Sequence, residues 1–345
     1  MTRRVVLLGV AGSLVGLVWC GLVVALTFDP HVSVGLPYAT TLQHPSSDRF
    51  DQQLALGDGQ FYAAMATDPS LSRPEVLRAP PAEYAYRWQR PGLAWLAIVT
   101  SGGRASAVPE AIVLITALSM GVLVAGAAAL LLAMGGPPEA GLLALLLPGT
   151  IAGATLTGPE ILATGLALFA VARAIEDDRA DGQTLALLVA AALLRETTLL
   201  VAMGLALWLA RRHRPWLATL LVPAGALVAW VVVVWIRLGY WPTDAGGARL
   251  GPPLVGLIQA APRWSTTTSA MVVASVLLVG AGVWWGRAAA RDLGWIALPM
   301  VLFASLQSDL VWIDWENPAR VLLPLAGMAL VAVIVGRPSR ALAEP

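Results

Sequence analysis

Long runs of apolar residues, separated by short polar connections, extend along the whole chain. The first run covers residues 5–27 and follows Arg3 and Arg4. Its length exceeds the roughly 7–15 residues of a signal-peptide core, so we interpret it as a retained first span. Runs of about 20 apolar residues are typical of transmembrane helices. Further runs occupy residues 108–133, 140–156, 161–175, 216–236, 268–285, 293–312 and 319–335. The pattern predicts an all-α polytopic membrane protein.

Arginine in the short connections sets the predicted topology. These connections lie at residues 176–183, 211–215, 287–292 and 337–340. Short loops rich in arginine stay in the cytoplasm, and the arginines before the first span place the N-terminus there too. Residues 184–210 lie between two such connections, so a single crossing helix would put them on opposite sides. We therefore expect a broken hairpin of two short helices that turns near residues 194–197.

About ten membrane segments result, with residues 337–345 as a cytoplasmic tail. Residues 28–92 form the longest polar segment, which we expect to be an extracytoplasmic loop with short helices. Residues 92–100 are apolar but too few to cross about 30 Å at about 1.5 Å per residue, so they predict an interfacial helix. With no internal repeat, residues 1–345 are expected to form a single domain.

Composition agrees with this pattern and excludes several chemistries. The 345 residues are 58% hydrophobic and 12% charged, whereas soluble domains are about 25% charged. The net charge of +1 gives no reason to expect nucleic acid as a partner. All 22 basic residues are arginine, which excludes Schiff-base lysines and Walker-type phosphate loops.

Cofactor and metal chemistry also have little support. Cys20 is the only cysteine, so intrachain disulfides and thiolate metal sites are excluded. His31, His44 and His213 have no metal-ligand spacing. We expect no cofactor and no metal site, although weak binding of a divalent cation by the carboxylate-rich loop stays open.

The first candidate for chemistry is Asp58, which lies between two glycines. Glycine permits tight backbone paths, so this carboxylate can stand on an uncrowded turn. The alternative is a turn aspartate that caps a short helix. Phe61, Tyr62 and Met65 follow at helical spacing and are expected to hold the element at the membrane surface. Asp48 and Asp51 stay open as alternatives to Asp58.

Further candidates are charged residues near the expected outer face. Arg87 and Arg90 are interleaved with aromatic residues and suit an anionic headgroup or phosphate; snorkelling arginines of an aromatic belt are the alternative. Arg195 and Glu196 lie at the expected hairpin tip, where charge is costly and usually faces a cavity or a partner. A structural ion pair is the alternative there. Glu160 and Arg320 lie at the same face and are candidate ligands. The alternatives are a helix cap for Glu160 and an interfacial anchor for Arg320.

Several of these motifs together resemble one protein superfamily. They are residues 58–62 with 66–69, then 86–91, 194–197 and 317–325. In this order they resemble bacterial multi-pass glycosyltransferases of the GT-C superfamily, which use polyprenyl-phosphate-linked sugars. The resemblance implies that Asp58 is the essential acidic residue of the first extracytoplasmic loop. The chain departs from many members, which have a second acidic residue beside the first.

The resemblance implies an inverting glycosyltransferase of the bacterial inner membrane and cell envelope. Asp58 would be the catalytic base, because a phosphate leaving group needs no general acid. Its partners would be a polyprenyl-phosphate-linked sugar, a glycan, lipid or protein acceptor, and membrane lipids. The expected substrate-binding residues are Gln60, Tyr62, Arg87, Gln89, Arg90, Glu160, Arg195, Glu196 and Arg320. A transporter or flippase of a lipid-linked or anionic substrate, or a non-catalytic membrane subunit, stays an alternative.

Overall fold

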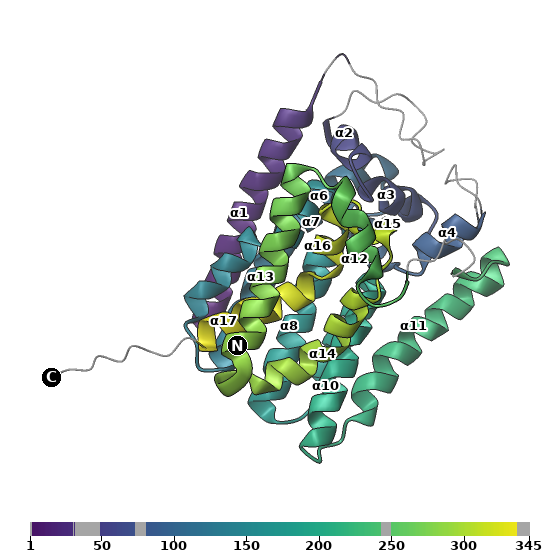
Figure 1. The fold of residues 1–345 in the computed structure, drawn as a ribbon. Coiled ribbons are helices and arrows are strands. Elements are labelled where there is room, and N and C mark those ends of the chain that lie inside the picture. The colour runs from purple at the N-terminus through teal and green to yellow at the C-terminus, as the bar shows by residue number, and fades with distance from the viewer. Residues whose placement is uncertain (1, 30, 32–48, 73–80, 243–249, 337–345) are drawn as a thin grey trace.

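The computed structural model describes residues 2–29, 31, 49–72, 81–242 and 250–336 (Figure 1). Within these ranges the chain is helical, and Leu250 and Gln307 form an isolated β-bridge. Four of the described helices are long and apolar enough to cross a membrane: α1 (Arg3–Thr27), α6 (Val108–Ala133), α11 (Leu217–Leu238) and α13 (Thr266–Ala289). They indicate a membrane-embedded protein, as the sequence predicts.

Helix α6 lies at the centre of the bundle and is buried along most of its length, whereas α1, α11 and α13 expose many Leu and Val side chains. Small residues let α1 approach α6 closely. A Cβ on Gly121 of α6 would lie 2.0 Å from Oγ of Ser13, and one on Gly16 would lie 2.1 Å from the backbone oxygen of Ala117. Such contacts are typical of helix pairs in membranes.

The hairpin predicted at residues 184–210 is confirmed. Helix α8 (Glu160–Asp177) leads into α9 (Gly182–Leu194), which ends at Arg195; the short η4 (Glu196–Thr198) then starts α10 (Leu199–Arg211). Beyond α10, Arg212 and Arg214 both pair with Asp178 of the connection before α9. The hairpin therefore begins and ends at the same side of the bundle. Each of its arms is about 20 Å long at about 1.5 Å per residue.

Three apolar runs that the sequence assigns to single spans are instead broken. Residues 140–156 form η3 (Pro138–Leu146) and α7 (Pro148–Thr155). Residues 319–335 belong to α16 (Glu316–Val321) and α17 (Leu323–Gly336). Pro148 and Pro324 explain these breaks, because each lies in the first turn of the second helix and has no N–H to continue the first.

The third break divides residues 293–312 into α14 (Arg291–Ser305) and α15 (Asp309–Trp312). Here the backbone between the helices bonds to another segment. The N–H of Gly251 donates to the oxygen of Leu306, at 2.7 Å, and the N–H of Leu254 donates to that of Ser305, at 2.6 Å. Two further helices, α12 (Val255–Ala260) and η6 (Ala261–Arg263), follow this contact.

The described residues between 49 and 107 form short helices, which gather at one end of the bundle (Figure 1). They are α2 (Arg49–Ala55), α3 (Gly59–Thr67) and α4 (Pro81–Trp88), followed by α5 (Gly92–Thr100) and η2 (Ala105–Ala107). The expectation that Phe61, Tyr62 and Met65 hold α3 at the membrane surface is wrong. All three are buried, because α3 packs on α5 and α6 in a continuous apolar core.

Replacing Gly204 is expected to loosen the contact that holds the hairpin against α14. A Cβ at Gly204 would lie 1.9 Å from the backbone oxygen of Ile296, so Gly204→Ala forces the helices apart and costs about 1–3 kcal/mol. Gly225→Ala in α11 is the control, since a Cβ there meets nothing within 4 Å. Thermal unfolding of both variants in detergent checks this, and equal melting temperatures would contradict it.

Candidate functional site

A polar cavity of about 350 Å³ lies where α3 and α4 meet the hairpin tip and α16. Asn317, Gln307 and Thr197 contribute uncharged polar groups to its wall. Seven residues singled out from the sequence also line it: Asp58, Arg87, Gln89, Arg90, Arg195, Glu196 and Arg320. The structure thus brings together residues from four separated parts of the chain. From the sequence, these charged residues are expected to lie near one face.

Asp58 is held between two arginines. It occupies the residue before α3, but its side chain makes no capping hydrogen bond, so the helix-cap alternative is not supported. Instead Oδ1 accepts from Nη1 of Arg87 at 3.1 Å, and Oδ2 accepts from Nη1 of Arg320 at 3.0 Å. Burial raises the pKa of Asp58, but Arg320 and then Arg87 outweigh burial and hold this pKa well below its usual range. Asp58 is therefore ionised at neutral pH.

Arg87 is positioned by three contacts. Its Nε donates to Glu83 one helical turn earlier in α4, at 2.8 Å, which is a favourable i,i+4 pair. Its Cζ also lies 3.9 Å from the ring centroid of Phe61. Together with the bond to Asp58, these contacts fix the guanidinium at the cavity wall. The pair with Glu83, one helical turn away, can be predicted from the sequence. The contacts with Asp58 and Phe61 cannot.

Arg90 is almost fully buried, with 4% of its side chain exposed. It donates to Glu196 through Nε at 2.5 Å and through Nη2 at 2.7 Å, and Nη2 also donates to the hydroxyl of Tyr86 at 2.9 Å. A snorkelling arginine keeps its head in water, so that alternative does not fit Arg90. The bidentate pair instead joins the segment after α4 to the hairpin tip.

Glu160 lies behind the arginines and does not line the cavity. It is 1% exposed, and its Oε1 lies 3.1 Å from Nη1 of Arg195 and 3.8 Å from Nη1 of Arg320. Arg320 also donates to Asn317 at 3.0 Å. Glu160 therefore acts on the cavity through the two guanidinium groups that it orients.

Besides Glu160, two further predicted ligands lie outside the cavity wall. Gln60 is buried and donates to the backbone oxygen of Gly57 at 3.0 Å, and Tyr62 is 3% exposed within the core. Both were predicted because they follow Asp58, but helix α3 turns them toward its neighbours. Among the alternative acids, Asp51 lies buried on α2 and Asp48 falls outside the described residues. Of the two acids that the structure describes, Asp58 is the one that lines the cavity.

Sequence reasoning missed five residues of the wall: Leu250, Phe303, Gln307, Leu310 and Val311. Gln307 lies inside an apolar run whose break is not visible in the sequence. In the described part of the chain, no three His, Cys, Asp or Glu side chains gather as a metal site would require. The chemical character of the cavity is set by four guanidinium groups that face two wall carboxylates, Asp58 and Glu196. Such a site suits an anion with several oxygens.

The Glu196→Gln variant is expected to lower the free energy of unfolding by about 2–3 kcal/mol, because it leaves the buried Arg90 without its anionic partner. Thermal or denaturant unfolding in detergent measures the change. Glu139→Gln is the matched control, since Glu139 is exposed and lies 3.9 Å from an exposed Arg4. Pairs of that kind contribute about 0–1 kcal/mol. Equal loss in both variants would contradict the importance of the Arg90–Glu196 pair.

Comparison with protein families, curated proteins and solved structures found no match to this chain. The geometry of the cavity and the chemistry of its wall are therefore the basis for assigning a function.

Proposed function

We propose that this chain is an inverting glycosyltransferase that moves a sugar from a polyprenyl-phosphate donor to an extracytoplasmic acceptor. The observation that carries the proposal is the convergence of Asp58 with Arg87, Arg90, Arg195 and Arg320 on one cavity. Guanidinium groups bind phosphate oxygens with charge-assisted, often bidentate hydrogen bonds. The resemblance of these motifs to the GT-C superfamily supports the same substrate class.

The proposed reaction needs one base and a stabilised leaving group. The acceptor hydroxyl oxygen attacks the anomeric carbon, while its proton passes to the carboxylate of Asp58. The bond between that carbon and the phosphate oxygen breaks, and its electron pair stays on the lipid phosphate. Attack opposite the leaving group inverts the anomeric centre. Arg320 and its neighbours stabilise the charge that develops on the phosphate.

Donor binding would also change the state of Asp58. In the unliganded site Asp58 is held by Arg87 and Arg320, and a carboxylate with a strongly lowered pKa is a weak base. An arriving phosphate competes for the same guanidinium groups. As the arginines turn to the phosphate, they release Asp58, and burial then favours its protonation. The base would thus gain strength only when the donor is bound.

The position of the cavity fits chemistry at the extracytoplasmic face of a bacterial inner membrane. Arg195 and Glu196 at the hairpin tip line the cavity, whereas Arg212 and Arg214 lie at the base of the hairpin beside Asp178. Because short arginine-rich connections stay in the cytoplasm, the cavity would lie toward the opposite face. A donor lipid would extend from there into the bilayer.

The direct test is sugar transfer by the purified chain in vesicles. A panel of radiolabelled polyprenyl-phosphate hexoses and pentoses is supplied together with bacterial envelope membranes as the source of acceptor. We expect release of free polyprenyl phosphate together with label in the acceptor fraction. Labelled donor that crosses the vesicle membrane without losing its sugar would contradict transfer. It would favour the second candidate, a transporter, for which a broken helical hairpin is also typical.

A further inference from the structure

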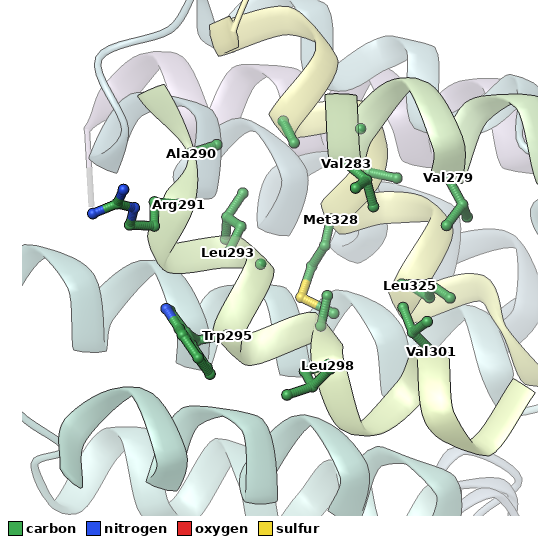
Figure 2. Close-up of a pocket in the computed structure, with 15 residues that line it drawn as sticks. Val279, Val283, Ala290, Arg291, Leu293, Trp295, Leu298, Val301, Leu325 and Met328 are labelled. Atoms are coloured by element: carbon green, nitrogen blue, oxygen red, sulfur yellow. The ribbon is translucent and has the colours of Figure 1, made fainter. Parts of the chain in front are cut away.

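A second cavity, of about 670 Å³, lies between α13, α14 and α17 (Figure 2). Its wall is almost wholly apolar and includes Val283 of α13, Leu298 and Val301 of α14, and Met328 of α17. It shares no wall residue with the polar cavity. The proposed glycosyl transfer does not use it, so a separate explanation is needed.

Helix α14 separates the two cavities. Leu298 and Val301 are three residues apart and share the face of α14 that turns toward α13 and α17. Phe303, which lines the polar cavity, is two residues beyond Val301 and so lies about 200° around the helix. Ile296 lies on the same face as Phe303 and packs on Gly204 of α10. A ligand in the polar cavity therefore does not extend directly into the apolar one.

The apolar cavity opens on the outside of the bundle. Val283 is 56% exposed, and Leu298 and Val301 are each more than a third exposed, on helices that border the membrane. An apolar cavity stays free of water, and one of about 150 Å³ already accommodates benzene. A much larger one that opens toward the bilayer has room for part of a hydrocarbon chain.

Positive charge lies at one end of this cavity. Arg291 and Trp295 line that end, and Val279, Val301 and Leu325 lie across from them (Figure 2). The Cζ of Arg211 lies 3.9 Å from the ring centroid of Trp295. Within the described part of the chain neither Arg211 nor Arg291 pairs with a carboxylate.

Asp292, the acid next to Arg291 in the chain, already pairs with another arginine. Asp292 accepts from Arg212 at 2.8 Å, so it does not neutralise Arg211 or Arg291. This end of the cavity therefore combines the guanidinium group of Arg291, an indole ring on which the guanidinium group of Arg211 lies, and an apolar interior. A phosphate attached to a hydrocarbon chain matches all three features.

We propose that this cavity binds an anionic phospholipid. The lipid phosphate lies at Arg211 and Arg291, and one acyl chain lies between α13, α14 and α17. Because the base of the hairpin carries the arginine-rich connections, the lipid comes from the cytoplasmic leaflet. This site is independent of the polar cavity and of the reaction proposed there.

Native mass spectrometry of the purified chain, with phosphatidylglycerol or phosphatidylcholine added, tests the proposal. The informative variant is Gly294→Leu, because Gly294 lines the cavity and a Cβ there meets nothing within 4 Å. The new side chain therefore enters the cavity from a Cβ that meets no neighbour. Gly280→Leu is the matched control on α13, where a Cβ also meets nothing within 4 Å and which lies outside the cavity wall.

The wild type and Gly280→Leu are expected to retain one phosphatidylglycerol, and Gly294→Leu to lose at least about tenfold in affinity. The double variant Arg211→Gln, Arg291→Gln should bind both lipids alike, since the preference for the anionic headgroup depends on these arginines. Equal retention by Gly294→Leu and the wild type would overturn the proposal. So would a wild type without preference for phosphatidylglycerol, or one that retains polyprenyl phosphate in its place.

Discussion

The Asp58→Asn variant is expected to transfer sugar about 10²–10⁴-fold more slowly than the wild type, because it lacks the base that takes the acceptor proton. The amide has nearly the same shape as the carboxylate, so the substrate geometry is kept. Turnover is measured as release of polyprenyl phosphate from the labelled donor at saturating concentration. The loss should fall on kcat, since proton transfer occurs in the chemical step.

The same variant is expected to bind lipid phosphate more tightly. Asp58 occupies Arg87 and Arg320 in the empty site, so a phosphate must displace it before it pairs with either. Removing the negative charge removes this competitor and leaves two partly buried guanidinium groups in need of an anion. Titration with polyprenyl phosphate should therefore show a lower Kd for Asp58→Asn than for the wild type.

Opposite changes in turnover and binding distinguish catalysis from a structural contribution, because a misfolded site would lower both. Asp177→Asn serves as the control, since Asp177 lies at the far end of α8 in an exposed pair with Arg173. It should leave both quantities unchanged. Undiminished turnover in Asp58→Asn would contradict its assignment as the base, and weaker phosphate binding would contradict the competition.

The broken hairpin was predictable from sequence because short arginine-rich connections flank it on both sides. The arginines of the short connections required that residues 184–210 turn back, and the structure contains that hairpin. The breaks near residues 147, 306 and 322 were not predicted, because apolar content alone does not distinguish a continuous helix from two short ones. Proline explains two of the breaks, and the third depends on bonds from the distant Gly251.

The site was predictable in its residue types but not in its pairings. Charged side chains are costly in an apolar setting, so Asp58 and the four arginines are expected to lie together at one site. In the structure they do. That Asp58 bonds to arginines 29 and 262 residues away is a property of the folded chain. The sequence likewise assigned Gln60 and Tyr62 to the ligand, because nothing in a short motif shows which side of α3 faces the cavity.

Arg320→Gln is expected to lower the affinity for polyprenyl phosphate by about ten- to a hundredfold, the effect of one charge-assisted hydrogen bond. Arg104→Gln is the control, since Arg104 is exposed and lies outside the cavity. A local unfolding of α16 would also weaken binding, so a second measurement is needed. The pH profile of kcat/KM, which reports the free enzyme, provides it.

Among the arginines that lower the pKa of Asp58, Arg320 has the largest effect, while burial raises this pKa. In the wild type, Asp58 stays ionised as the pH falls through mildly acidic values, and its contribution to stability is lost only below the pKa of about 3.9 that it has when unfolded. Without Arg320 the pKa of Asp58 in the empty site must rise, so the acid limb of the kcat/KM profile, which reports the free enzyme, should move to higher pH. A kcat/KM that falls equally at every pH would indicate a structural defect and contradict the coupling. A limb that moves only in Arg320→Gln, and not in Arg104→Gln, would show that Arg320 holds both the donor phosphate and the base.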